Sequence, residues 1–160
     1  MPALRGAPVV RVWRKGDGMS LYAGQDREQL RAAWRESWQR FLQGRPLAPL
    51  QAQMSDLIRM HPEYTQHLDG LMAANSAAAA DATSTNAFLH LALHLALREQ
   101  LATNRPAGIA LVHQRLAAAH GDTHAAEHRM IETLGQVLWD AQRAGRMPDE
   151  QLYIEALRRL

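Results

Sequence analysis

Residues 86–103 read NAFLHLALHLALREQLAT, which is the most apolar helical stretch in the chain. Leucine, alanine and phenylalanine surround the expected helix on several sides, so other helices must cover it in water. A lone helix of this composition would aggregate. We therefore predict that residues 86–103 form the central apolar helix of the fold.

The rest of the chain also favours helices. Apolar residues recur at helical spacing between residues 30–42, 50–58, 109–116 and 131–141. A further short helix is expected over 62–72 and a loop over 75–85. The usual signals for helix starts and stops lie between these segments, at Asp26, Gly44, Gly121, Asp122 and Pro148. The sequence thus predicts an all-α bundle of five or six helices, forming one domain over residues 25–160.

Residues 1–24 differ from this pattern. They are basic, and valines followed by Gly16-Asp17-Gly18 are compatible with a short hairpin. A flexible basic arm fits the same residues, so both alternatives stay open. Elsewhere, Trp34, Trp38 and Trp139 have core spacing and are expected inside.

The composition excludes several classes of protein. The chain has 160 residues, of which 47% are hydrophobic and 21% charged, as in an ordinary globular domain. The absence of cysteine excludes disulfides, thiolate metal sites and cysteine nucleophiles. A net charge of +2 gives no reason to expect nucleic-acid binding. Without a membrane-spanning apolar run or a signal peptide, we expect a cytoplasmic protein.

Two pairs of histidines have the spacing of ligands on one helix face. His90 and His94 are four residues apart in the central helix, and His124 and His128 repeat this spacing in a long helix over 122–145. Two facing helices could close four ring nitrogens around one ion. Hydrogen bonds inside the core could satisfy the same imidazoles, and the spacing does not choose between these interpretations.

A carboxylate accompanies the second pair. Glu127 falls in the middle of the apolar stripe of its helix, where an unpaired charge is costly to bury. A metal ion, an imidazolium or an arginine such as Arg98 or Arg105 would serve as its partner, and the sequence leaves these open. His61, at a helix junction, is a fifth candidate imidazole.

The predicted ligands all have side chains that bind borderline metals. They are His61, His90, His94, His124, Glu127 and His128. Nitrogen and carboxylate ligands do not select among Zn, Fe, Mn and Ni. Residues 124–128 also fit the H-x-x-E-H string of one peptidase class. That fold needs a ligand far downstream, and only 32 residues follow His128, all of them expected to be helical.

Several segments resemble those of one family. They are NAFLH at 86–90, LHLALREQ at 93–100, RPAGI at 105–109, HAAEH at 124–128 and LWDAQR at 138–143. They are similar to a small proteobacterial family of His-rich helical proteins described only as a domain of unknown function. The likeness covers roughly residues 21–160 and carries no activity over. The family pattern has His and Glu where this chain has Thr65 and Ala125, so a ligand role is closed to these two positions.

Two functions follow from these observations. The first is a helical metalloprotein with a His-rich site between the 86–103 and 122–145 helices, able to take a small molecule at the metal. The alternative is a non-enzymatic interaction module in which histidines and Glu127 form a buried structural network. The sequence does not decide whether the site is catalytic, and it is compatible with a homo-oligomer.

Overall fold

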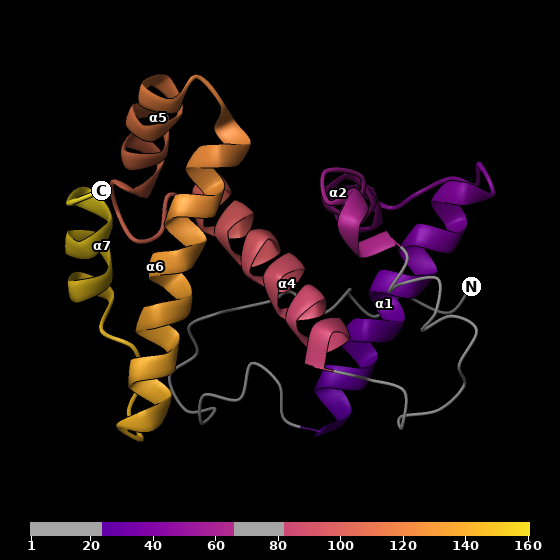
Figure 1. Cartoon of the computed structure of the whole chain (residues 1–160), viewed down its shortest axis with the longest axis horizontal. Helices are drawn as coiled ribbons and strands as arrows, with labels where there is room; N and C mark the ends of the chain where they lie inside the picture. The colour runs from indigo at the N-terminus through magenta and orange to yellow at the C-terminus, as the bar shows by residue number, and fades with distance from the viewer. Residues whose placement is uncertain (1–23, 66–81) are drawn as a thin grey trace. The chain divides into compact units, whose positions relative to one another are not determined.

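The chain is all-α in the part that the structure describes. A computed structural model describes residues 24–65 and 82–160, with side chains from 29–65 and 87–160. These residues contain six labelled helices and no strand, and residues 62–65 are also helical (Figure 1). The helices are α1 (Gly24–Leu42), α2 (Pro49–Arg59), α4 (Ala82–Thr103), α5 (Ile109–His120), α6 (Thr123–Arg143) and α7 (Glu150–Arg158).

This result confirms the predicted all-α class. The hairpin or arm predicted near the N-terminus lies outside the described residues, as does the end of the helix predicted over 62–72. None of the described helices is long and apolar enough to cross a membrane.

The chain divides into two compact units. Among the described residues, the first unit contains 24–65 and 82–92, and the second contains 93–160. Helix α4 therefore contributes its first half to one unit and its second half to the other. The single domain predicted over 25–160 stays a prediction.

The first unit packs α1 against α2. Trp34 on α1 and Leu57 on α2 are fully buried. Ser55 Oγ donates a hydrogen bond to the backbone carbonyl of Ser37 at 3.1 Å, which links the two helices. Gly44 adopts a φ of +63° just beyond α1, where a residue with a side chain would be strained.

The second unit consists of the second half of α4 with α5, α6 and α7. A two-residue junction separates α5 from α6: Gly121 has a φ of +67°, and the Asp122 side chain accepts a hydrogen bond from the backbone N–H of His124 at 2.9 Å. Both residues take the roles that the sequence predicts. Tyr153 on α7 donates to Gln100 Oε1 on α4 at 2.9 Å, which ties the last helix to the core.

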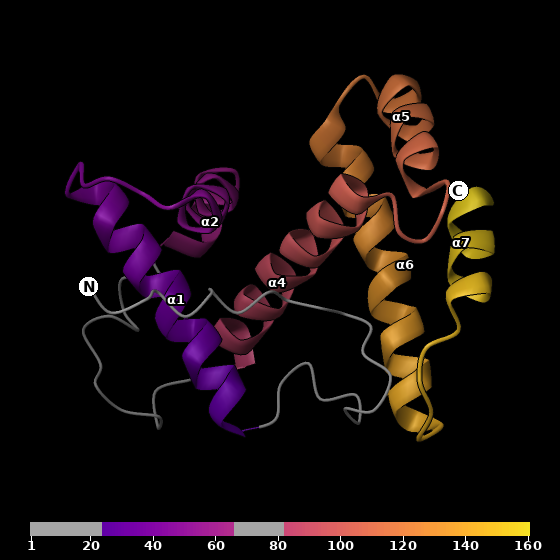
Figure 2. The same ribbon diagram turned by 180° about the vertical axis from the view of Figure 1, so that it is seen from behind.

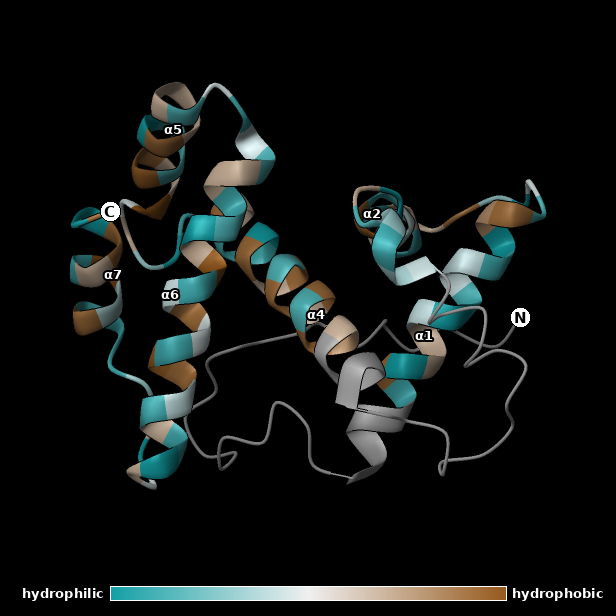
Figure 3. Ribbon diagram, viewed as in Figure 1, coloured by the Kyte–Doolittle hydropathy of each residue, from teal (hydrophilic) through white to brown (hydrophobic). Residues whose placement is uncertain are grey.

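Helix α4 is covered all round where the sequence is most apolar. Residues 94–97 are four consecutive buried positions, which together cover every side of a helix. This confirms the central apolar helix. In contrast, α6 is amphipathic, and Figure 3 shows hydrophobic and hydrophilic residues alternating around it. Its buried stripe includes Ile131, Leu134 and Leu138.

One aromatic prediction is wrong. Trp34 and Trp38 are buried as expected, but the side chain of Trp139 is 57% exposed. Leu138 takes the inward position, and the next residue is turned by about 100° around the helix. Trp139 therefore lies beside the buried stripe and outside it.

Candidate metal centre

Three imidazoles gather in the second unit. His94 is fully buried on α4, whereas His124 and His128 are half-buried in the first turns of α6. The Asp122 cap fixes the start of α6, and so places these two rings one turn apart on the same side of the helix.

The three rings are in mutual contact. The His94 and His124 rings are stacked with centroids 5.1 Å apart, and the His128 ring lies 4.9 Å from His94 and 4.2 Å from His124. One ligand nitrogen from each ring lies within 4.8 Å of those of the other two. Because zinc–nitrogen bonds are about 2.0–2.1 Å long, two ligands of one ion are roughly 3–4 Å apart. The three rings could therefore hold a metal ion after small movements.

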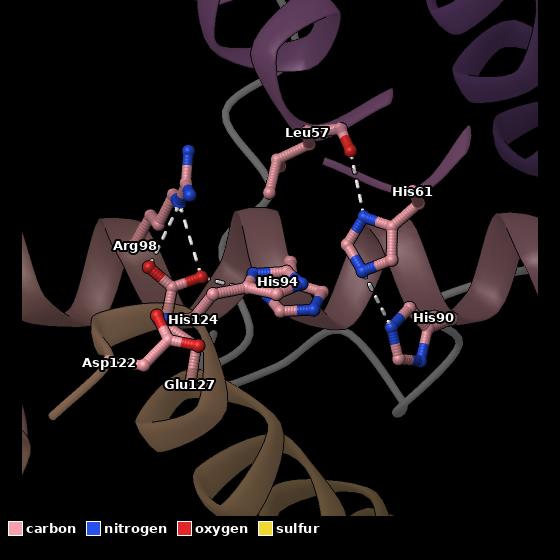
Figure 4. A network of polar contacts seen from close by, with 8 residues as sticks. All are labelled: Leu57, His61, His90, His94, Arg98, Asp122, His124 and Glu127. Carbon is pink, nitrogen blue, oxygen red and sulfur yellow. Dashed lines mark hydrogen bonds and ion pairs between the residues drawn. The ribbon is translucent and has the colours of Figure 1, made fainter. Parts of the chain in front are cut away.

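Glu127 joins His94 to Arg98. Its Oε2 accepts a hydrogen bond from His94 Nδ1 at 2.9 Å, and Arg98 Nε lies 3.3 Å from Oε1 and 3.4 Å from Oε2 (Figure 4). Burial alone would raise the pKa of this carboxyl, but the hydrogen bond from His94 and the charge of Arg98 outweigh it, so the pKa is lowered. Glu127 is thus an ionised, buried carboxylate with two partners.

This contact fixes the proton on the His94 ring. An ionised carboxylate can only accept hydrogen bonds, so His94 carries its proton at Nδ1. In the neutral ring Nε2 then has the free electron pair that a metal would use. Metal-bound histidines commonly donate their other ring N–H to a carboxylate in this way.

Two further histidines form a pair in the first unit. His61 is buried, and its Nδ1 donates to the carbonyl of Leu57 at 2.7 Å (Figure 4). Its Nε2 lies 3.0 Å from Nε2 of His90, on α4. With the proton of a neutral His61 at Nδ1, His90 is the donor in this contact. The Tyr64 ring stacks on His61 at 5.6 Å.

The structure therefore brings together three of the six predicted ligands, His94, His124 and His128, with Glu127 beside them. Of the partners considered for Glu127, it shows Arg98 and His94, while Arg105 is exposed. The ligand roles of all six residues stay predictions. Sequence analysis missed Tyr64, although its position one helical turn after His61 was a usable signal.

Comparison with known proteins agrees with the resemblance drawn from the motifs. No curated protein and no solved structure matches the chain. One family model matches residues 26–159. This range includes every described helix, apart from the first residues of α1. The chain therefore belongs to the family described as a domain of unknown function, DUF1841.

Proposed function

We propose that the second unit binds a transition-metal ion through His94, His124 and His128. The observation that carries this proposal is the mutual contact of three imidazoles from two helices, with ligand nitrogens within 4.8 Å of one another. Imidazole suits Zn, Fe, Ni and Cu, and with a nearby carboxylate Mn is also compatible. The chain offers no thiolate to narrow this set.

A bound ion would join segments that are distant in the sequence. His94 comes from α4 and the other two ligands from the start of α6, 30 residues later. An ion that binds only the folded arrangement stabilises it by mass action. The ion would therefore hold α4 against α6 in addition to any Lewis-acid chemistry it supplies.

Glu127 would serve this ion by positioning a ligand. Both of its oxygens are engaged by His94 and Arg98, so its contribution is to orient the His94 ring and to increase the basicity of Nε2. This differs from the direct ligation predicted for Glu127 from the sequence.

The first test is metal analysis of protein purified without an affinity tag, before and after reconstitution with Zn²⁺ or Co²⁺. We expect about one equivalent of metal, and a loss of at least about tenfold in affinity for His94→Ala, His124→Ala and His128→Ala. His120→Ala is the matched control, because His120 is an exposed histidine at the end of α5. Less than about a tenth of an equivalent after reconstitution would rule the proposal out.

The same series tests the two histidines of the first unit. The sequence predicts that His61 and His90 are also ligands, so His61→Ala and His90→Ala should each lower the metal affinity. Affinity equal to that of the His120→Ala control would remove them from the ligand set.

The second candidate function is an interaction module whose histidine network is structural. It is favoured by the contacts of Glu127, which already has two hydrogen-bonding partners. In that case chelator and added metal would leave the melting temperature unchanged, while His94→Ala would lower it. A melting temperature that rises with metal and falls with chelator favours the metal site instead.

A further inference from the structure

The candidate metal centre lies where the second half of α4 meets the start of α6, and these two segments lie side by side in both views (Figures 1 and 2). His94 is fully buried on one side of the centre. On the other side, His124 and His128 are only half-buried. Their partial exposure gives solvent and small solutes access to an ion held by the three rings.

Three imidazoles do not complete the coordination of a transition-metal ion. Zinc in proteins has at least four ligands, and sites with three protein ligands keep the fourth position for water or another small molecule. The nearby carboxylate of Glu127 is already engaged, because its oxygens contact His94 Nδ1 and Arg98 Nε. The three histidines therefore leave at least one position for a ligand from outside the chain.

The charges around the centre favour an anion in this position. Histidine binds a metal as a neutral imidazole, so three histidines leave the full charge of a divalent ion. The charge of Glu127 does not reduce it, because Arg98 balances this carboxylate at 3.3 Å. Asp122 at the start of α6 is exposed, so water and salt screen its charge. A divalent ion beside the buried His94 would thus lack compensating negative charge, which is costly.

We propose that the metal centre binds a small oxygen-donor anion, such as a carboxylate, as a further ligand of its ion. This inference rests on the metal site proposed above and gives it a class of ligand. The ion would polarise a carboxylate bound in this way, so small organic acids are the substrate class that fits the centre. In their absence water would take the same position.

Optical titration of the full chain loaded with Co²⁺ tests this inference, because the visible absorption of Co²⁺ changes with its ligands. We expect sodium acetate to produce a saturable spectral change at constant ionic strength. Acetamide is the matched control, since it has nearly the same shape without the charge. Acetate should bind at least about tenfold more tightly, because only the anion is attracted by the charge of the ion.

Two substitutions test whether charge selects the anion. Glu127→Gln removes the negative charge beside the ion and should strengthen acetate binding, whereas Arg98→Gln removes the balancing positive charge and should weaken it, each by at least about threefold. Arg143→Gln is the control, because Arg143 is exposed at the far end of α6 and should leave acetate binding unchanged. Circular dichroism verifies that the variants fold, and excess Co²⁺ keeps the centre loaded.

Several results would overturn the inference while leaving the metal site intact. A Co²⁺ spectrum that acetate does not change would show that the chain itself fills the coordination of the ion. A response that appears only in His61→Ala would identify His61 as that ligand. Equal binding of acetate and acetamide, or shifts of the same sign in Glu127→Gln and Arg98→Gln, would show that charge does not select the ligand. Failure to bind Co²⁺ at all would instead refute the metal site, and this inference with it.

Discussion

Glu127 is the residue whose surroundings say most about the candidate centre. It is a buried carboxylate whose two donors, His94 and Arg98, are one turn apart on α4. Removing its charge would weaken the ion pair with Arg98 and give the His94 imidazole a weaker acceptor. Comparing charged Glu127 with a neutral side chain at this position therefore measures its effect on stability and its effect on metal binding separately.

Glu127→Gln should lower both the metal affinity and the free energy of unfolding. The amide oxygen can still accept from His94, so the ring orientation is retained, but the lost charge reduces ligand basicity and weakens the contact with Arg98. We expect roughly tenfold weaker metal binding and a decrease of about 1–3 kcal/mol in the free energy of unfolding. Competition titration with a metal indicator and urea denaturation measure these effects.

Glu36→Gln, an exposed carboxylate on α1, is the control and should change neither quantity. Unchanged metal affinity in Glu127→Gln, with reduced stability alone, would show that the carboxylate has only a structural role.

At the scale of single residues, the sequence predicted that Glu127 needs a partner but did not identify that partner. Glu127 was identifiable because it interrupts an apolar stripe, and burial of an unpaired charge is costly. Whether Arg98, on α4, or Arg105, just after it, reaches Glu127 depends on which part of this segment faces the start of α6. That register is set by the packing of two helices, which periodicity within either helix does not contain.

At the scale of elements, most helix ends were predictable because they depend on local chemistry. Gly44, Gly121 and Asp122 act where the sequence places them. The exception is α4, which begins at Ala82, inside the loop predicted over 75–85. Serine, threonine and asparagine disfavour helix interiors, but they are well suited to a first turn, and composition alone does not separate the two cases.

Two glycines of the second unit should respond oppositely to alanine. Gly135 is within α6, and an added Cβ would meet Leu93 Cδ1 at 3.6 Å, an ordinary van der Waals contact. Gly135→Ala should therefore raise the free energy of unfolding by about 1 kcal/mol through helix propensity. Gly121 has a φ of +67°, so Gly121→Ala should lower it by roughly 1–2 kcal/mol.

Thermal and urea denaturation measure both glycine variants. A destabilised Gly135→Ala variant would mean that α6 cannot accept the contact with Leu93, and that α4 and α6 are more tightly packed there than the structure indicates.

At the scale of the whole molecule, stability should fall at alkaline pH because of one buried phenol. Burial raises the pKa of Tyr153 above its ordinary value of 10.0. Because the folded-state pKa is the higher one, the neutral phenol contributes its full stability below pH 10, and this contribution is lost as the pH rises further. The slope approaches about 1.4 kcal/mol per pH unit.

Urea denaturation between pH 9 and 12 measures this slope against Tyr153→Phe. The variant loses the hydrogen bond to Gln100, worth about 1 kcal/mol at neutral pH, and should show a shallower decline at high pH. Equal slopes for the two proteins would show that the Tyr153 phenol ionises freely in the folded chain.

The junction of Gly121 and Asp122 has a mechanical consequence. Two residues reach at most about 7 Å, so the last turn of α5 cannot move away from the first turn of α6. A force applied to the outer side of α5 is passed directly to the turn that bears His124 and His128. Displacement of α5 should therefore change the spacing of the imidazoles.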